Sequence, residues 1–378
     1  MRILHTADWH LGKVLKGVDR TPEIAAAMDE LLALVKRERI DAVIAAGDLF
    51  DHPNPGAEAE AAFYRFLAGL KALGVPLVGV AGNHDSRSRL EALAPVLEHL
   101  GARLAGELRF FEEGGVVDLL GMRVAAVPFL SERRLIKGAE LLEEDPGASM
   151  QRYAGLMGRL FQNLAQGFTP GAINLMVGHL TVDGAALGGG EFKLYVGQSY
   201  AVPATAFPPE ATYVALGHIH RQQQVGDVAW YAGSLVQLDF GEHEAAPRGA
   251  LVVELEPGRP PRVEPVGGYG KPLRTFRFDL AELDRRMEEV AAFPGYARLI
   301  VRGRGDAALR ARILRAHPHV LEVAFEAEGE EAQPLTVPEA LSWSEAYARY
   351  HQETYGEPPD AALKKAFEEA LEAAHAAD

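Results

Sequence analysis

Short apolar runs that end abruptly in glycine and a polar side chain recur along this chain. The clearest is Ala42-Val43-Ile44-Ala45-Ala46, which is followed by Gly47 and Asp48. An apolar run of this length between polar residues predicts a buried parallel strand. Because ligands of open α/β sheets bind beyond the carboxyl ends of such strands, Asp48 is predicted to lie at the functional edge of a sheet.

The same pattern occurs four more times. Residues 2–7 run into Asp8 and His10, 76–81 into Asn83 and His84, 173–177 into His179, and 213–216 into His218 and His220. Apolar residues at helical spacing fill the segments 21–39, 88–100 and the stretch that ends near 73. This alternation predicts βαβ units on a parallel core, with Thr21 as a helix N-cap and Pro22 at the first helical position.

The second half of the chain changes character more than once. Short strands are predicted within 102–130, a helix near 149–165, and further strands around 228–231 and 250–255. The glycine-rich segment 184–190 fits either a flexible surface loop or a lid that faces the substrate. Proline and glycine are dense from 257 to 272, which indicates a domain boundary.

A small α/β unit is predicted after that boundary, with strands at 274–278, 297–301 and 320–326 and helices at 281–292 and 307–316. Two terminal helices follow, one opened by a capping box at Ser342 and one by the prolines at 358 and 359. We therefore expect three domains, 1–268, 269–333 and 334–378.

Composition narrows the chemistry. The chain has 378 residues, of which 48% are hydrophobic and 24% charged, and this is ordinary globular composition. Cysteine is absent, so disulfides and thiolate ligands are excluded and a metal must be held by His, Asn and carboxylate. No apolar segment reaches the ~20 residues of a membrane helix, and Met1 leads into a strand rather than a signal, so we expect a cytoplasmic protein without a membrane partner.

The formal net charge is −15, which repels a polyanion at long range. If nucleic acid is the substrate, its contacts must be local or supplied by a partner. The best candidates next to the polar motifs are Lys13, Arg87, Arg89 and especially Arg221, with Lys16 and Arg20 beside them. Each of these side chains is equally consistent with an ordinary solvated surface charge.

The five polar motifs, in this order, resemble those of the calcineurin-like metallophosphoesterases. Over essentially the whole chain, through the stretch 238–241, the small α/β unit and the terminal helices, the pattern resembles the nuclease subunits of bacterial double-strand-break repair complexes in that superfamily. The resemblance implies an α/β fold: an αββα sandwich, a small α/β capping domain for DNA specificity and a C-terminal helix pair.

The resemblance also implies two metal sites and a catalytic histidine. One metal would be held by Asp8, His10, Asp48 and His220, and the other by Asp48, Asn83, His179 and His218. Asp48 bridges the two, whereas His84 is not a ligand and stabilises or protonates the leaving oxygen. Some relatives have a histidine directly after the Asp-Leu-Phe stretch; here Asp51 stands there and His52 follows, so a substrate-orienting role for His52 is left open.

The chemistry of these residues agrees with that assignment. Two carboxylates among otherwise neutral ligands leave a site for two divalent cations with net positive charge, which suits a phosphodiester. Metals ~3.5–4 Å apart lower the pKa of a bridging water and clamp both oxygens of an in-line displacement. Nitrogen and oxygen ligands without sulfur favour two Mn²⁺, with Fe or Mg possible. The other histidines are predicted to be surface or capping residues: His5, His99, His243, His317, His319, His351 and His375.

Apolar faces on the two terminal helices are larger than two short helices can bury against each other. These faces comprise Trp343, Tyr347 and Tyr350 on one helix and Leu363, Phe367 and Leu371 on the other. They predict a partner surface, although docking onto the chain's own domain also fits. The resemblance implies that the partner is an ATPase with a long coiled coil, and that the chain forms a homodimer.

Three functions remain. The leading one is a Mn-dependent DNA nuclease, a 3′–5′ exonuclease on double-stranded DNA and an endonuclease on hairpins or blocked ends that acts with the ATPase; its polarity and hairpin cleavage rest on the resemblance alone. A phosphatase or cyclic-nucleotide phosphodiesterase could use the same site, but has no evident need for the extra domain and helix pair. A scaffold with an idle site would have been free to lose Asp8, His84 or His179, all of which are present.

Overall fold

The structure is a computed structural model that describes residues 1–130, 146–189, 201–326, 347–348, 351–352, 358–360 and 363–367. Residues 1–301 and 305–324 form one compact unit, and residues 302–304 and 325–378 form a second. The predicted boundary at residue 333 lies outside the described residues. Among the helices described, none is long and apolar enough to cross a membrane.

Two six-stranded sheets form the centre of the first unit. In the first sheet the strand order is β16-β15-β1-β4-β5-β6. Its strands are β1 (Arg2–Thr6), β4 (Ala42–Ala45), β5 (Leu77–Val80), β6 (Ala102–Ala105), β15 (Ala250–Glu254) and β16 (Arg262–Val266). The four strands β1, β4, β5 and β6 are parallel, whereas β15 runs antiparallel to β1. The predicted parallel strands therefore exist, with their carboxyl ends at one edge.

The second sheet has the order β13-β14-β12-β9-β8-β7. Its strands are β7 (Val116–Leu119), β8 (Met122–Val127), β9 (Asn174–His179), β12 (Tyr213–Gly217), β13 (Gln223–Val225) and β14 (Ala229–Tyr231). The inner strands β8, β9, β12 and β14 are parallel. Two short pairs stand outside both sheets: the hairpin of β2 (Val14–Leu15) and β3 (Val18–Asp19), and β10 (Thr181–Val182) with β11 (Ala201–Val202).

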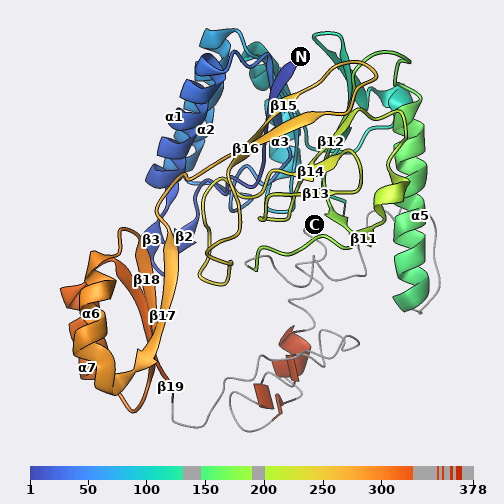
Figure 1. Cartoon of the computed structure of the whole chain (residues 1–378). Coiled ribbons are helices and arrows are strands. Elements are labelled where there is room, and N and C mark those ends of the chain that lie inside the picture. The colour runs from blue at the N-terminus through green and yellow to red at the C-terminus, as the bar shows by residue number, and fades with distance from the viewer. Residues whose placement is uncertain are drawn as a thin grey trace. The chain divides into compact units, whose positions relative to one another are not determined.

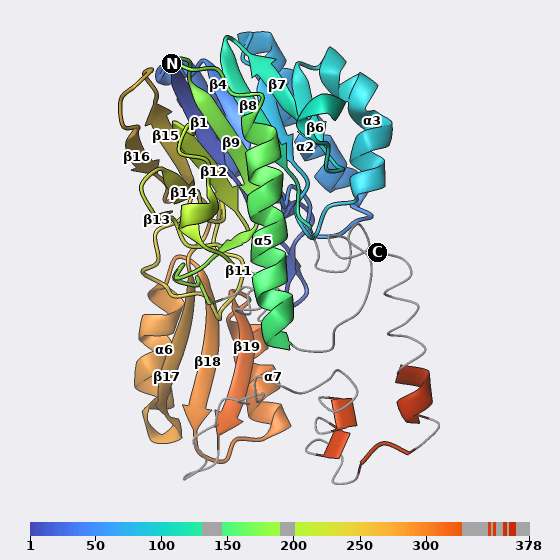
Figure 2. The ribbon, with the colours of Figure 1, turned by 90° about the vertical axis from the view of Figure 1, so that its right-hand side faces the viewer.

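Helices cover the outer face of each sheet, as Figures 1 and 2 show. The helices α1 (Thr21–Arg37), α2 (Ala57–Leu73) and α3 (Arg87–His99) lie on the first sheet, and α5 (Pro146–Ala165) lies on the second. Side chains alternate between layers: Leu4 packs under the first set of helices, whereas Ile3 packs between the sheets. This period-2 alternation gives four layers, α, β, β and α, because both faces of each sheet are apolar.

One predicted helix boundary is wrong by a residue. Arg20 occupies the N-cap of α1 without a side-chain cap bond, and Thr21 is already helical. The Thr21 amide donates to the side chain of Asp19 over 2.8 Å. The prediction failed because the short side chain that satisfies this amide comes from the preceding hairpin.

The small α/β unit matches the predicted order of elements. It consists of β17 (Leu273–Asp279), α6 (Leu283–Ala292), β18 (Tyr296–Arg302), α7 (Ala307–Ala316) and β19 (Val320–Glu326), with the sheet order β17-β18-β19. Leu273 packs with Leu15 of the β2–β3 hairpin and with Phe240. The three-stranded sheet is therefore packed against the two-sheet core through an apolar contact of its own.

His5 corrects the sequence-based interpretation, which placed it at the surface. The residue is completely buried, because β1 is covered on both faces and His5 points in the same direction as Ile3. His5 Nε2 lies 3.1 Å from the Leu216 carbonyl, and Nδ1 lies 2.9 Å from the Tyr213 hydroxyl. Since a carbonyl only accepts, Nε2 carries the proton and Nδ1 accepts from Tyr213. By contrast, His99 and His243 are exposed as predicted, and His375 lies outside the described residues.

This burial predicts an acid-sensitive contribution to stability. Burial lowers the pKa of His5 to about 3 from the model-compound value of 6.5, so the unfolded chain binds a proton between these values that the folded chain does not. Stability therefore falls as the pH falls through this window, by about 2 kcal/mol between about pH 7 and pH 5. We expect the His5→Gln variant, whose amide can keep both hydrogen bonds, to lose about 2 kcal/mol less than wild type over the same interval in urea unfolding. Equal losses in the two proteins would contradict the prediction.

In the second unit, the described part of the terminal helices includes one close contact. The rings of Tyr347 and Phe367 stack with centroids 4.1 Å apart and planes 3° apart, and Leu363 is 40% exposed. The two predicted apolar faces thus meet at this pair. Trp343, Tyr350 and Leu371 lie outside the described residues, so the larger partner surface stays a prediction.

Candidate two-metal active site

The predicted polar residues gather at the carboxyl edge shared by the two sheets. Asp8 follows β1 and Asp48 follows β4, and the two loops run alongside each other. The Asp8 amide donates to the Gly47 carbonyl over 2.9 Å, and the His10 amide donates to the Asp48 carbonyl over 3.1 Å. The second sheet joins them through the His218 amide, which donates to the Asp8 carboxylate over 3.0 Å. Two backbone–backbone bonds and one bond to the Asp8 carboxylate therefore fix these loops relative to one another.

Gly47 and Gly82, which precede the polar residues, stand where a side chain would collide with neighbouring atoms. Gly47 has a φ of +91°, and a Cβ there would meet the His179 ring and the Gly82 amide. A Cβ on Gly82 would collide with the Asp48 side chain. The loops pack so closely that only glycine leaves room for the neighbouring ligand.

Several of the polar residues hold an unfavourable backbone conformation. Positive φ values occur at Asp8 (50°), His10 (49°), Asp48 (49°) and His218 (96°). This conformation has a free-energy cost for residues other than glycine, and such outliers cluster at functional sites. The cost is offset by the backbone hydrogen bonds between the loops.

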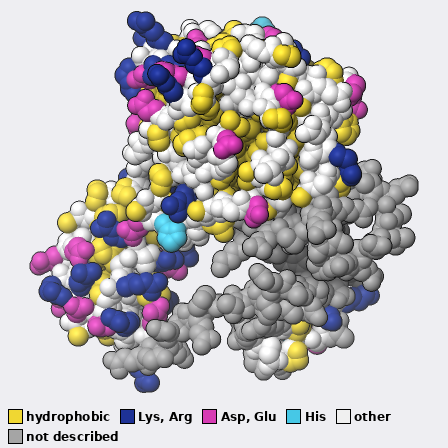
Figure 3. All heavy atoms as spheres, turned by 45° about the vertical axis from the view of Figure 1, so that its right-hand side comes forward, with side chains coloured by type: hydrophobic (Ala, Val, Ile, Leu, Met, Phe, Trp, Pro, Cys, Tyr) yellow, Lys and Arg dark blue, Asp and Glu magenta, His cyan; other side chains and the backbone are white. Residues whose placement is uncertain are grey.

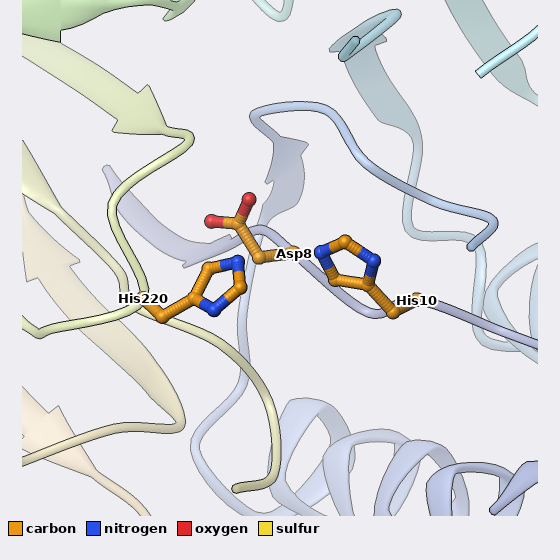
Figure 4. Close-up of side chains that lie close together, drawn as sticks. All are labelled: Asp8, His10 and His220. Atoms are coloured by element: carbon orange, nitrogen blue, oxygen red, sulfur yellow. The ribbon is translucent and has the colours of Figure 1, made fainter. Parts of the chain in front are cut away.

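Asp8, His10 and His220 form the first of two groups, drawn in Figure 4. One potential ligand atom from each lies within 4.8 Å of the others, and all three residues are buried. His10 Nδ1 lies 3.0 Å from the Asp51 carboxylate, whereas its Nε2 is buried without a hydrogen-bond partner. That orphaned nitrogen lies 3.6 Å from Asp48 Oδ2. A buried imidazole nitrogen aimed at carboxylates fits a metal ligand.

Asp48 also belongs to the second group. Its Oδ2 lies 3.4 Å from His179 Nε2. Asn83 Oδ1 lies 3.0 Å from the same nitrogen and 2.9 Å from His218 Nδ1. The other nitrogen of His179 donates to the Ala46 carbonyl over 2.7 Å, which leaves Nε2 directed at the group. Asp8, Asp48 and His179 also form a group that could hold a metal. The seven predicted ligands thus lie together at this edge, and their division between two ions stays a prediction.

His84 lies beside the clusters without joining the second. Its backbone amide donates to Asp48 Oδ1 over 2.9 Å, and its Nδ1 donates to the Asp51 carbonyl over 2.9 Å. The ring lies 4.8 Å from the His10 ring. Because the carbonyl holds Nδ1, Nε2 is the nitrogen available to a substrate. Geometry alone also groups His84 with His10 and Asp48 as a set that could hold a metal.

Burial and charge shift the pKa values of the site in opposite directions. Burial raises the pKa of Asp8 to about 6, although His179 and His220 oppose it. Burial also disfavours charge on Asp48, but the histidines around it, His179 first, hold its pKa well below the usual value. Burial lowers the pKa of His10 to about 4, whereas Asp48 overcomes burial and raises that of His179 to about 9. The site thus places a charged carboxylate among imidazoles, which suits a divalent cation.

Two carboxylates on the loops after β4 and β5, Asp51 and Asp85, also contact this site although the sequence-based ligand set omitted them. Asp51 holds His10 through its side chain and His84 through its carbonyl. Asp85 accepts hydrogen bonds from the amides of Gly82, Leu49 and Phe50 over 2.8, 3.2 and 3.0 Å. Asp85 therefore ties the β4 and β5 loops together. Both lie inside motifs already noticed, but their partners are fixed only by the fold.

The predicted DNA-contacting residues are mostly engaged within the protein. Lys13 Nζ lies 3.2 Å from Asp51, and Arg89 pairs with Glu60. Arg87 and Arg221 are half-buried. Figure 3 shows cationic and anionic side chains intermixed over the described surface of one face. Lys13 and Arg89 are thus paired with carboxylates, and a DNA role for these four residues stays a prediction.

Arg20 and His52, which also lie next to the polar motifs in the sequence, differ from these four residues in their contacts and exposure. Arg20 is completely buried, pairs with Glu23 over 2.6 Å and lies over the Tyr296 ring, so it is structural. The side chain of His52 is 69% exposed and lies 3.3 Å from Asp51 Oδ2. His52 therefore flanks the site without entering either cluster.

Similarity to known proteins agrees with this fold and site. The family profile described as Calcineurin-like phosphoesterase matches residues 1–222. Those residues are more than half of the chain and include all seven predicted ligands, so the chain belongs to the calcineurin-like phosphoesterases, the class of metal-dependent phosphoesterases that the fold and site define. The resident cofactor of such a site is a divalent metal.

Within that class the chain is related to the SbcD component of the nuclease SbcCD. It is 33% identical to the Bacillus subtilis SbcD component over 97% of both chains. The Rhodobacter capsulatus SbcD component is 35% identical over 70% of this chain and 69% of its own. The Escherichia coli K12 SbcD component is 32% identical over 76% of this chain and 74% of its own.

Proposed function

We propose that this chain is a two-metal, Mn²⁺-dependent DNA nuclease that acts with an SbcC-type coiled-coil ATPase in double-strand-break processing. The observation that carries the proposal is the pair of ligand clusters that share Asp48. The relationship to the SbcD component of SbcCD over 97% of the chain supports a nuclease rather than another phosphoesterase. Mn²⁺ suits the seven ligands because they are imidazole, carboxylate and amide oxygen without sulfur.

In this proposal each cluster holds one cation. Asp8, His10, Asp48 and His220 hold the first, and Asp48, Asn83, His179 and His218 hold the second. Two divalent cations held there would supply Lewis acidity for in-line attack of water on the phosphodiester. Two carboxylates give the empty ligand set a negative charge that attracts divalent cations. Because the other five ligands are neutral, the site with two cations would have a net positive charge that favours a phosphate.

The chain itself contributes orientation and a proton. His84 Nδ1 donates to the Asp51 carbonyl, which fixes the ring and presents Nε2. A protonated His84 would then donate from Nε2 to the leaving or a non-bridging oxygen of the scissile phosphate. Asp51 also holds His10, so one residue orients a metal ligand and the proton donor together.

The remaining parts of the proposal concern substrate, partner and assembly. We expect 3′–5′ exonuclease activity on double-stranded ends and endonuclease activity on hairpins. The proposed local phosphate contacts are Lys13, Arg87, Arg89 and Arg221. The ion pairs of Lys13 with Asp51 and of Arg89 with Glu60 would have to break first. The terminal helices are proposed to grip the ATPase, which would supply the cationic surface that a chain of net charge −15 lacks. A homodimer in the cytoplasm completes the proposal.

Cleavage of end-labelled duplex and hairpin DNA by the purified full chain tests it. We expect cutting with Mn²⁺ and none after EDTA treatment, because the clusters supply ligands but no nucleophile of their own. Restoring Mn²⁺ after chelation should restore cutting. The matched substrate is bis-p-nitrophenyl phosphate. Hydrolysis of this diester with DNA left intact, with and without the ATPase, would favour the phosphatase or phosphodiesterase alternative, and no hydrolysis of either would favour the scaffold.

A further inference from the structure

A buried carboxylate outside the seven predicted ligands faces one of them. Glu242 Oε1 lies 3.0 Å from His220 Nδ1, and the Glu242 side chain is 0% exposed. His220 follows β12, whereas Glu242 comes from the loop between β14 and β15. Glu242 directly follows the stretch 238–241, which the sequence singled out and to which neither cluster gives a role.

The second oxygen of Glu242 is held on its other side. Oε2 accepts from the Leu238 amide over 3.2 Å and lies 3.6 Å from the Arg248 guanidinium. The Ser234 amide donates to the His220 carbonyl over 3.1 Å, so the loop also grips the backbone of the ligand. Rotation of the Glu242 carboxylate away from His220 would therefore also break the contacts of Oε2 with Leu238 and Arg248.

The loop segment that carries Glu242, residues 237–244, is anchored in the three-stranded sheet. The Leu273 amide donates to Gln237 Oε1 over 2.8 Å, and Arg298 donates to the Phe240 carbonyl over 3.2 Å. Glu244, two residues beyond Glu242, pairs with Arg274 over 3.1 Å. A carboxylate on a segment held at several points is preorganised rather than recruited by a ligand.

The chemistry of the contact decides the state of His220. An ionised carboxylate has only acceptors, so Nδ1 of a neutral His220 must carry its proton. The lone pair then lies on Nε2, on the opposite side of the ring from Glu242, and His220 groups with Asp8 and His10. A carboxylate behind a metal-binding imidazole also increases its basicity.

We propose that Glu242 is a positioning residue that fixes the tautomer and ring orientation of His220, so that Nε2 presents its lone pair to the divalent cation held with Asp8 and His10. The inference rests on the proposed metal site. Glutamine cannot replace Glu242. If its amide oxygen faces His220, its NH₂ opposes the Leu238 amide. If it is reversed, its NH₂ faces Nδ1 and favours the wrong tautomer.

Calorimetric titration of the metal-free full chain with Mn²⁺ tests the inference without using catalysis. Wild type should bind two ions. Glu242→Gln and Glu242→Ala should weaken one of the two sites by about 10- to 100-fold and leave the other unchanged. Glu264→Gln is the matched control, because it makes the same change at an exposed glutamate of β16, outside the segment 237–244; its two affinities should equal those of wild type.

The outcomes separate this inference from the proposed function. Absence of Mn²⁺ binding by wild type would reject the proposed metal site itself. Two normal sites in both Glu242 variants would overturn the role of Glu242 while leaving that site intact. A measurement on metal-free wild type avoids any folding defect of the variants: imidazole ¹⁵N spectra should show neutral His220 protonated at Nδ1. An Nε2-protonated ring would overturn the proposal.

Discussion

Asp48→Asn is expected to reduce Mn²⁺-dependent DNA cleavage by about three orders of magnitude or more, equivalent to about 4 kcal/mol of transition-state stabilisation. Asp48 is the carboxylate that the proposal assigns to both cations, with Oδ2 at 3.6 Å from His10 Nε2 and 3.4 Å from His179 Nε2. Asparagine keeps the shape but removes the charge, and its NH₂ would face these nitrogens as a donor. Both proposed cations would therefore lose a ligand.

The measurement is the initial rate of duplex cleavage together with Mn²⁺ bound per chain. We expect fewer than two ions bound by the variant and a rate near background. Asp227→Asn provides the matched control, because Asp227 lies in an exposed turn between β13 and β14, and this variant should cleave as wild type does. Cleavage by Asp48→Asn within about tenfold of wild type would remove Asp48 from the bridging position.

His84→Ala is expected to lower the rate of cleavage by about 10²- to 10⁴-fold, the usual contribution of a positioned acid or base, with metal binding unchanged. The structure makes this substitution informative. The contact from residue 84 to Asp48 is made by the backbone amide, which alanine retains. The variant thus removes the imidazole and leaves the restraint on the bridging carboxylate.

His52→Ala is the control for His84→Ala. His52 is also a histidine near the site, but its side chain is 69% exposed, and within the described structure it contacts the buried carboxylate Asp51, outside the predicted ligand set. We expect its cleavage rate to stay close to that of wild type. Loss of bound Mn²⁺ in His84→Ala would instead make His84 a ligand, as its grouping with His10 and Asp48 allows. A large defect in His52→Ala would restore the substrate-orienting role that the sequence left open.

Local sequence was sufficient for much of the fold. Helix α7 was predicted with the bounds Ala307–Ala316 that the structure has, because an apolar stripe and flanking turn residues are local signals. The strands before Asp8, Asp48 and Asn83 could be read for the same reason. Residues that depend on distant partners could not. His5 lies inside the predicted strand 2–7, but only the packing of the second sheet against β1 buries it with Tyr213 and Leu216.

The site residues likewise fall into those that the sequence could identify and those whose roles depend on distant partners. Asp8, Asp48 and His179 could be named because each ends a buried run, and the carboxyl ends of parallel strands share an edge. Asp51, Asp85 and Glu242 could not be given roles, since a carboxylate in a loop is ordinary until its partner is known. Glu242 and His220 are 22 residues apart in sequence, and no periodicity connects them.

The sequence by itself determined the class of this protein, since strand-terminal Asp, His and Asn without cysteine specify nitrogen and oxygen ligation at a sheet edge. It also determined the order of the elements, because apolar spacing is a short-range property. Only the tertiary structure decided how the ligands are oriented. Two sheets must pack face to face before the Ala46 carbonyl reaches His179 or Asp48 lies between two clusters. These contacts join residues far apart in the chain, and their geometry arises from packing rather than from any local pattern.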